Sequence, residues 1–418
     1  MKATYTKAIV WTIDAECLSP LRTGGADGDA ETVLHSHDGR AMIQGSSISG
    51  CLRGWLERSD YREHTDSLFG TQERSGCLRF SDALFSPNTR ITVRPRLRID
   101  GTSGTAEDGK KFDLAHVETG SHFTFTVSML GSDPAADAEA LEAALGALNS
   151  GEITLGAQKT NGFGRVRLSV GKRCFDLSKQ PDRDAWLNDE TEGEPITLPT
   201  MADSSKVVFT VSGTLGSLLV KSSQPKSDGD RTYTENIREA GKAVLPGSSV
   251  KGALRARAEM ITEHMGFPPQ FIETIFGTDA DAEQKRPGEV TCFDAYPSEQ
   301  GTKISRIRIN KLTGGVMRGA LFTEEPVSGD ITLKISVENS CPQGCALVLY
   351  ALRDLGLGLW NLGSGGSVGR GYLKVRELTS QTPHGQKLTL RFDEDTCTSE
   401  DPDKLAETWI RALREATI

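Results

Sequence analysis

Residues 45–53 read Gly-Ser-Ser-Ile-Ser-Gly-Cys-Leu-Arg, and residues 247–255 read Gly-Ser-Ser-Val-Lys-Gly-Ala-Leu-Arg. Each stretch begins with residues that favour a helix start and continues with apolar residues at helical spacing. The two copies lie about 200 residues apart, whereas the repeats of a solenoid are roughly 20–45 residues long. The sequence therefore predicts two whole domains of one kind in a single chain.

Five landmarks recur in the same order and support this duplication. They are Asp27-Gly28-Asp29 and Asp228-Gly229-Asp230, the helix start, Phe69-Gly70-Thr71 and Phe276-Gly277-Thr278, Asp82-Ala83 and Asp294-Ala295, and Leu155-Gly156 with Gly162-x-Gly164 and Leu362-Gly363 with Gly369-x-Gly371. We expect a first domain over 1–170, an acidic linker over 171–204, a second domain over 205–392, and an acidic tail with a short helix over 393–418.

The pattern of apolar residues predicts the same elements in each copy. In the first copy these are a strand over 5–14, the Gly-Ser-Ser helix, strands near 90–99 and 121–130, a helix over 137–149 and a closing strand from Val166. The second copy repeats them at 206–213, 304–309, 330–337, 344–355 and from Leu373. This order predicts an α+β protein made of two tandem ferredoxin-like domains, the fold that RNA-recognition modules use.

Composition excludes several classes of protein. No run of 18 apolar residues is present, so we expect no membrane span. The eight cysteines are scattered without a framework or paired zinc spacing, which favours the reducing cytoplasm and no zinc site. The net charge of −9 argues against nucleic acid, but residues 182–194 and 393–403 contribute −5 and −6 of it. The rest of the chain carries +2, which leaves room for basic grooves.

The Gly-Ser-Ser helices are candidate phosphate sites because a helix start offers free backbone N–H groups and the positive end of the dipole. We expect Ser46, Ser47, Ser248 and Ser249 to be N-caps, and Arg53, Lys251 and Arg255 to add charge one to two turns further on. The alternative is a plain capped helix that packs on a sheet.

The glycine-rich loops 156–164 and 363–371 would let RNA approach the backbone closely, with Lys159, Arg165 and Arg370 in or beside them. They precede a strand, whereas a dinucleotide-binding loop opens a helix.

Alternating basic residues predict two basic strand faces. Arg90, Arg94, Arg96 and Arg98 would share one side of a half-buried strand, and Lys303, Arg306, Arg308 and Lys311 would do the same in the second copy. We take Arg94, Arg96, Arg306 and Arg308 as RNA-binding candidates. The alternative is an edge strand protected by charge.

The two Asp-Gly-Asp loops are the only repeated acids in a polar loop. Their carboxylates would hold Mg²⁺ through waters or position a ribose hydroxyl, and the alternative is simple turn chemistry. His35 and His37 are weaker candidates for acid–base groups. Cys341 and Cys345 lack the second pair that a zinc site needs.

The ordered set of motifs resembles the RAMP superfamily, and most of all the backbone subunits of type III CRISPR effector complexes. Two modules in one chain resemble the fused subunits of type III-D complexes. The resemblance implies that the chain binds CRISPR RNA (crRNA) along the helix and the glycine-rich loop, together with target RNA and other effector subunits. It also implies hairpin "thumbs" at about 86–117 and 297–322.

The resemblance further implies that a loop aspartate cuts target RNA with Mg²⁺, through attack by a 2′-hydroxyl. In the family this aspartate lies about fifteen residues before the motif's leading proline. That position is Asp29 in the first copy, where Gln44 replaces the proline, and Asp230, one residue further than expected from Pro246, in the second. Asp27 and Asp228 are the runners-up. Ser49 stands where the motif has lysine, which weakens one phosphate contact.

Three other functions stay open. The chain could be a non-catalytic scaffold that only orders the guide. It could instead be a ribonuclease that processes precursor crRNA without metal, with His35 or His37 as acid–base group. The third is a ferredoxin-like enzyme for a small phosphate ligand.

Overall fold

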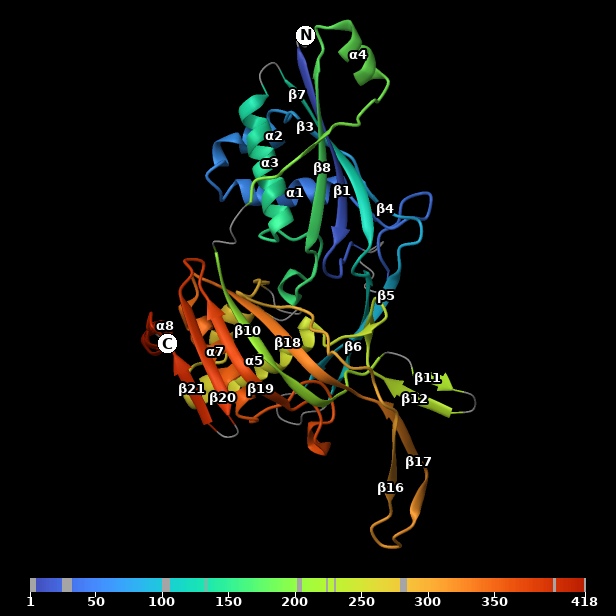
Figure 1. The fold of residues 1–418 in the computed structure, drawn as a ribbon, viewed down its shortest axis with the longest axis vertical. Helices are drawn as coiled ribbons and strands as arrows, with labels where there is room; N and C mark the ends of the chain where they lie inside the picture. The colour runs from blue at the N-terminus through green and yellow to red at the C-terminus, as the bar shows by residue number, and fades with distance from the viewer. Residues whose placement is uncertain are drawn as a thin grey trace. The chain divides into compact units, whose positions relative to one another are not determined.

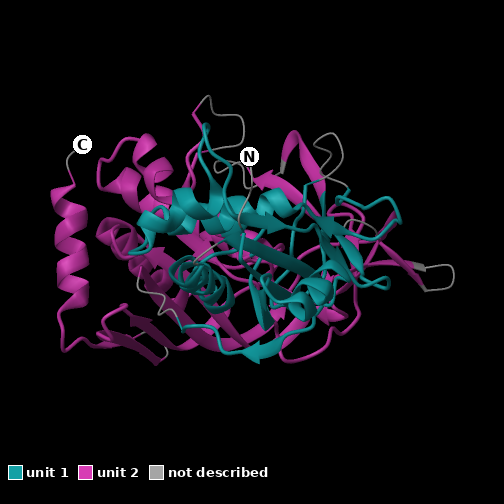
Figure 2. Ribbon diagram, turned by 90° about the horizontal axis from the view of Figure 1, so that it is seen from above, with its two compact units in different colours: residues 1–93, 114–159, 163–203 teal, residues 94–113, 160–162, 204–418 magenta. Residues whose placement is uncertain are grey.

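The computed structural model describes residues 5–24, 32–99, 106–131, 134–200, 205–222, 225–228, 231–278, 284–393 and 396–416. The chain forms two compact units (Figure 2). Unit 1 contains residues 1–93, 114–159 and 163–203, and unit 2 contains 94–113, 160–162 and 204–418. Two segments of the first repeat, 94–113 and 160–162, thus belong to unit 2.

Unit 1 is built on an antiparallel sheet whose central strands have the order β4, β7, β1, β8 (Figure 1). These strands are β4 (Ala83–Phe85), β7 (His122–Gly131), β1 (Lys7–Cys17) and β8 (Val166–Asp176). Trp11, Ile13 and Ala15 alternate along β1 and are fully buried, as a strand with one face in the core requires. They share that core with helices α1 (Gly45–Leu56) and α3 (Ala135–Ser150).

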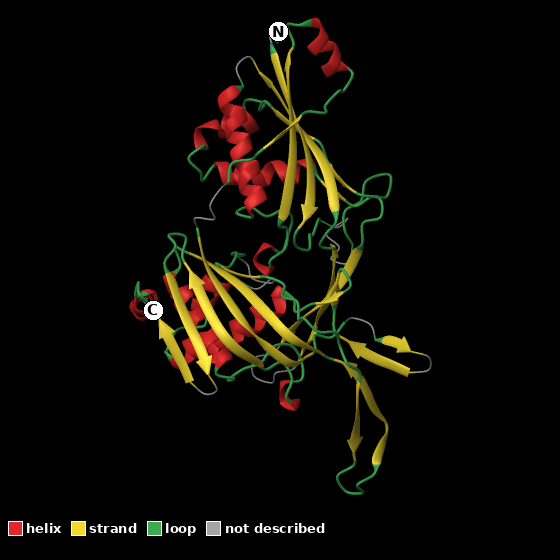
Figure 3. Cartoon of the chain, viewed as in Figure 1, coloured by secondary structure: helices red, strands yellow, loops and turns green. Residues whose placement is uncertain are grey.

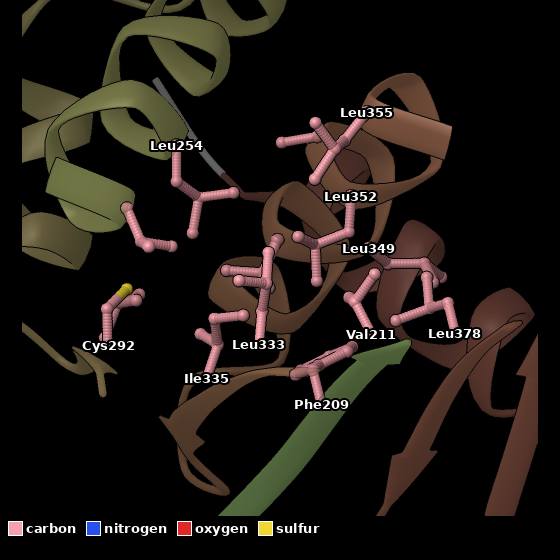
Figure 4. Close-up of a cluster of buried hydrophobic side chains, with 14 of the residues drawn as sticks. Phe209, Val211, Leu254, Cys292, Leu333, Ile335, Leu349, Leu352, Leu355 and Leu378 are labelled. Carbon is pink, nitrogen blue, oxygen red and sulfur yellow. The ribbon is translucent and has the colours of Figure 1, made fainter. Parts of the chain in front are cut away.

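Unit 2 repeats this arrangement with the strand order β15, β18, β10, β19, and Figure 3 shows its strands in yellow with helices in red beside them. Its strands are β15 (Val290–Cys292), β18 (Val327–Glu338), β10 (Lys206–Leu218) and β19 (Leu373–Gln381), and its helices are α5 (Gly247–His264) and α7 (Pro342–Gly356). Figure 4 shows the core, in which Phe209 and Val211 of β10 face Leu349 and Leu352 of α7. The prediction of two tandem ferredoxin-like α+β domains is confirmed.

The strands expected near 90–99 and 304–309 exist but lie outside these two sheets. β5 (Ile91–Ile99) pairs with β6 (Ala106–Val117), and β16 (Ile304–Ile309) pairs with β17 (Val316–Glu325). Both hairpins fall at the positions expected for thumbs. The second strand of each main sheet is instead β4 or β15, and three residues are too few to display an alternating pattern.

The segments expected to be linker and tail carry regular structure. Residues 171–204 include the end of β8, α4 (Gln180–Leu187) and β9 (Glu194–Ile196), which pairs with β8. Residues 393–418 include β21 (Thr396–Glu400), which pairs with β20 (Lys387–Asp393), and α8 (Leu405–Glu415). The apolar side of α8 is buried through Trp409 and Leu413. The tail contains the short helix expected there, α8, and both segments also add a strand to a main sheet.

Shorter elements complete the two units. They are β2 (Met42–Ile43), α2 (Thr65–Phe69), β3 (Leu78–Phe80), β11 (Lys226–Asp228), β12 (Arg231–Glu235), β13 (Arg238–Glu239), β14 (Lys242–Ala243) and α6 (Gln270–Phe276). Across the described ranges, every helix is too short or too polar to cross a membrane.

A distant aspartate caps the first helix of each repeat. The N–H of Gly45 donates to Asp82 Oδ1 at 2.8 Å, and the N–H of Gly247 donates to Asp294 Oδ1 at the same distance. The expected serine caps are wrong: the helices begin at the glycines, so the serines lie inside the first turn. A Cβ at Gly247 would lie 2.2 Å from the Cys292 carbonyl oxygen, which explains the repeated glycine.

Asp294 also belongs to a buried ionic cluster within unit 2. Arg94 Nη2 lies 2.7 Å from Asp294 Oδ2 and 2.7 Å from Glu239 Oε2, and the Arg94 side chain is 2% exposed. Burial lowers the pKa of Arg94, but the two carboxylates outweigh it and hold that pKa above its ordinary value. Asp82 has no comparable ion pair among the described residues.

The two capping aspartates should therefore differ in their contribution to stability. We expect Asp82→Ala to cost about 1 kcal/mol, the usual value of a helix cap. Asp294→Ala should cost roughly 3 kcal/mol or more, because it also leaves a buried guanidinium with one carboxylate. Hydrogen exchange of α1 and α5 under increasing urea measures each loss locally, and equal losses would contradict the difference.

Candidate nucleic-acid interface

The first turns of α1 and α5 present the same pattern of backbone donors. The glycine N–H groups go to the capping aspartates, and Ser47 and Ser249 donate to the carbonyls of Gln44 and Pro246. In the described part of the chain, the N–H groups of Ser46 and Ser248 have no acceptor. Each helix start therefore keeps one backbone donor for an anion, at the positive end of the helix dipole.

Lys251 lies one turn into α5 and is half-buried. Burial, and after it the charge of Arg255, lowers the pKa of its amine from 10.5 to about 8. Its neighbour Cys292 cannot balance the charge, because burial raises the pKa of that thiol to about 12. None of the carboxylates in the described ranges pairs with Lys251. The helix start thus combines a free N–H group with an unbalanced cation.

Arg53 and Arg255 occupy equivalent positions on the two helices and have equivalent partners. Arg53 Nε donates to Glu57 and Arg255 Nε donates to Glu259, both at 2.9 Å. Exposed pairs of this kind contribute little to stability, so a phosphate could replace the glutamate at low cost. Arg255 also donates to the Gly277 carbonyl at 3.2 Å, which ties the Phe-Gly landmark to the helix.

Each glycine-rich loop is closed by one backbone hydrogen bond, and the two loops share this geometry. The N–H of Leu155 donates to the Gly164 carbonyl at 2.9 Å, and Leu362 donates to Gly371 at 2.8 Å. Gly164 and Gly371 have φ values of +84° and +76°, and a Cβ on either would lie within about 2 Å of the leucine carbonyl. Only glycine fits these two positions.

The basic residues of these loops have different surroundings. Lys159 is exposed, and its Nζ lies 3.6 Å from Cys51 Sγ on α1. Arg165 is half-buried against Gly151. Arg370 is only 3% exposed, and its Nη1 lies 2.7 Å from Glu324 Oε2 at the base of the β16–β17 hairpin. Arg370 therefore has a structural contact where we expected an RNA contact.

The hairpin arginines do not form the predicted face. Arg94 is buried with two carboxylates, so it is dropped from the RNA-binding candidates. Arg96 is half-buried beside it, and burial, then the Arg94 charge, lowers its pKa to about 10. The aliphatic neighbours Ile91, Val93 and Leu97 are the exposed ones. Arg306 is half-buried and Arg308 is exposed.

The Asp-Gly-Asp loops are described only in part. Asp27, Asp29 and Asp230 lie outside the described residues. Asp228 is the last residue of β11, which pairs with β12, and β12 pairs with the hairpin strand β17. The described residues contain no group of three or more metal-ligating side chains.

The weaker sequence candidates His35 and His37 form no side-chain hydrogen bond or ion pair among the described residues. His35 and His37 are both exposed near a tight turn, and His35 forms an isolated bridge with Ala41. All eight cysteines are free thiols, including the buried Cys341 and Cys345.

Sequence reasoning missed the acids that organise these surfaces. Asp82 and Asp294 were used only as markers of the repeat, although an acid repeated beside a glycine-led helix is a signal for a cap. Glu239 and Glu324 carry no signal of their own, because their partners Arg94 and Arg370 are distant in the sequence.

Comparison with known proteins gives one family. A sequence model of the RAMP superfamily matches residues 14–167 and again residues 210–374, together more than half of the chain. A solved chain described as "Cryo-EM structure of the Type III-B Cmr-beta bound to cognate target RNA" matches with 15% identity and a TM-score of 0.33. The match covers 41% of this chain and 61% of that one, about three fifths of its length. No curated protein sequence matches.

The low pKa of Lys251 predicts a pH-dependent gain in stability for Lys251→Met. Below pH 8 the folded chain holds a charged, half-buried amine, so the substitution should raise the free energy of unfolding by about 2 kcal/mol. Between pH 8 and 10.5 the folded amine is neutral while the unfolded one is still protonated, so the gain should shrink. Urea unfolding across this pH range measures it, and a gain that stays constant to pH 10.5 would contradict it.

Proposed function

This chain belongs to the RAMP superfamily, and from that membership we propose that it is a crRNA-binding backbone subunit of a type III CRISPR effector complex. We propose that it works in the cytoplasm with target RNA and other effector subunits. The proposal draws on both repeats, because each matches the family separately.

The start of α5 is the observation that carries the binding proposal. A free N–H group at Ser248 and an unbalanced ammonium group at Lys251 suit a phosphate, which accepts hydrogen bonds and carries negative charge. A phosphate beside Lys251 would restore the amine's pKa towards its ordinary value. These contacts carry no base information, so the groove would hold a guide of any sequence.

The first repeat would bind the same backbone less strongly. Ser49 stands at the position of Lys251, so α1 offers its N–H group at Ser46 without the adjacent amine. Exposed Lys159 beside Cys51 could supply the missing charge from the glycine-rich loop. We retain Ser47, Arg53, Ser249, Arg255 and Arg165 as secondary contacts.

We further propose that the chain cuts target RNA at Asp29 and Asp230, with Asp27 and Asp228 as runners-up. In the reaction, a ribose 2′-oxygen forms a bond to the adjacent phosphorus and the bond from phosphorus to the 5′-oxygen breaks. The 2′-hydroxyl loses its proton and the leaving 5′-oxygen gains one, which leaves a cyclic phosphate. An aspartate near the scissile phosphate would help hold the nucleotide in line for this attack.

Mg²⁺ belongs to this proposal only through the family resemblance and the loop carboxylates. When bound, it would offset charge on the phosphate. The described residues contain no group of three or more metal-ligating side chains, so no step is assigned to the metal. A scaffold without catalysis remains the second candidate.

The binding proposal predicts weaker and less salt-dependent RNA affinity for Lys251→Ala and Arg255→Ala. Each substitution should lower the slope of log affinity against log salt by about 0.7–0.9, the contribution of one neutralised phosphate. Fluorescence anisotropy with two unrelated guide sequences measures this effect, which should be equal for both. Arg411→Ala is the matched control, because Arg411 is an exposed arginine on α8 paired with Glu407. Unchanged slopes in both variants would remove these residues from the groove.

The cleavage proposal predicts two independent cuts at a fixed separation. Asp29→Ala should reduce one cut by about 100-fold or more and Asp230→Ala the other, with guide binding retained. Denaturing gels of end-labelled target RNA resolve the two products, and EDTA tests the metal requirement. Asp403→Ala, an exposed acid near the chain's end, is the control. If both cuts survive the double variant, these aspartates are not the catalytic residues; if the unmodified chain makes no cut, the scaffold function stands instead.

A further inference from the structure

A cysteine and a lysine lie side by side in the first repeat. Cys51 is on the second turn of α1, and Lys159 belongs to the glycine-rich loop 156–164. Lys159 Nζ donates to Cys51 Sγ at 3.6 Å, and the Cys51 thiol donates to the Thr154 carbonyl at 3.8 Å. The sulfur is therefore held between two groups that the chain supplies just before this loop and within it.

The backbone on both sides of this contact is anchored. Cys51 lies in the middle of α1, whose apolar side is buried in the core of unit 1. In the loop, the N–H of Ala157 donates to the Arg22 carbonyl at 3.0 Å. Lys159 follows two residues after this anchor, so its amine reaches the sulfur by rotation of its own side chain.

The pair belongs to the first repeat alone. Ala253 stands at the position of Cys51 in the second repeat, and Gly366 stands at the position of Lys159. The second unit forms the same helix and the same closed loop without either side chain. The shared fold therefore does not require this contact, which leaves its chemistry to be explained.

The surroundings of Cys51 differ from those of the buried thiols. Burial raises the pKa of Cys341 to about 11 and that of Cys292 to about 12, so both thiols stay protonated near neutral pH. Reactive cysteines are partly exposed and lie in electropositive surroundings. Cys51 is partly exposed and has the exposed Lys159 as its hydrogen-bond donor.

We propose that Cys51 and Lys159 form a covalent sulfur–oxygen–nitrogen bridge when the chain meets dioxygen, and that thiol reductants reverse it. An S–O and an O–N bond form, while the S–H bond, one N–H bond of the neutral amine and the O–O bond break. Sulfur and nitrogen lose two electrons each, and dioxygen takes all four. One oxygen atom stays in the bridge, and the other leaves as water with the two displaced hydrogens.

The bridge would change the electrostatics of the glycine-rich loop. A nitrogen bonded to oxygen is far less basic than an amine, so Lys159 would lose its positive charge near neutral pH. The loop would also be tied to α1. The effect on RNA rests on the proposed function, in which Lys159 supplies charge to the first repeat, whereas the bridge itself does not.

Peptide mass spectrometry of the full chain tests the bridge. One sample is kept without oxygen in dithiothreitol, and the other is incubated in oxygen-saturated buffer before digestion. We expect only the second to contain the Cys51 and Lys159 peptides joined, with their summed mass plus one oxygen and minus two hydrogens. Dithiothreitol added afterwards should remove this species.

Matched variants show whether the two side chains react with each other. Cys51→Ser and Lys159→Arg should each abolish the joined peptides, whereas Cys174→Ser, which removes an exposed thiol on β8, should leave their yield unchanged. An unreacted Cys51, or its oxidation to a sulfinic acid without the link, would overturn the proposal. The same joined mass in the Lys159→Arg chain would overturn it as well.

Guide-RNA binding separates the bridge from its effect. Oxygen treatment should lower the slope of log affinity against log salt by about 0.7–0.9, the contribution of one phosphate contact. The treated Cys51→Ser chain should keep its slope, and dithiothreitol should restore that of the unmodified chain. A bridge without a change in slope would overturn the effect on RNA. If the reduced chain binds no RNA at all, the proposed function fails, while the masses still decide the bridge.

Discussion

The carboxylate of Asp294 is divided between two contacts, and the architecture of unit 2 depends on both. One oxygen accepts the first N–H of α5, and the other holds Arg94 from a segment some 200 residues earlier in the chain. Because both contacts use one side chain, the start of the helix and the seat of the β5–β6 hairpin cannot shift independently. Gly247, which has no Cβ to clash with the Cys292 carbonyl, and Asp294, which accepts the Gly247 N–H, are two of the residues by which the duplication is recognised.

The free N–H group of Ser248 and the half-buried amine of Lys251 illustrate why the proposed binding site at α5 costs stability. Lys251 is held half-buried without a carboxylate, at a free-energy cost that an apolar residue would avoid. The equivalent helix in unit 1 has Ser49 there and an exposed first turn. The two helix starts have therefore diverged, and under the proposed binding role the second repeat would be the better site for an anion.

Sequence reasoning predicted the repeat and most of the main strands and helices, because periodicity and repeated glycines report local geometry. The family resemblance supplied the two hairpins, and the short strands β4 and β15 were missed. Sequence reasoning failed where the contacting residue lies far away in the sequence. Alternation along β5 correctly separated Arg94 from Ile91 and Val93 but not which side is buried, because that depends on Glu239 and Asp294. The serine caps failed for a similar reason, since the real cap is a distant acid. Of the four loop acids, three lie outside the described residues, so the catalytic assignment stays a prediction.

The membership of residues 94–113 in unit 2 has a consequence for biosynthesis. The hairpin leaves the ribosome long before Glu239 and Asp294 exist, and translation of the intervening 200 residues takes roughly 10–40 s at ordinary rates. Throughout that interval Arg94 lacks both of the carboxylates that hold it in the folded unit. The arginines of the hairpin then have a second role. Charged side chains on an edge strand discourage pairing with other nascent strands until Glu239 and Asp294 have been synthesised. Synthesis order thus leaves Arg94 without its carboxylates until translation reaches the second repeat.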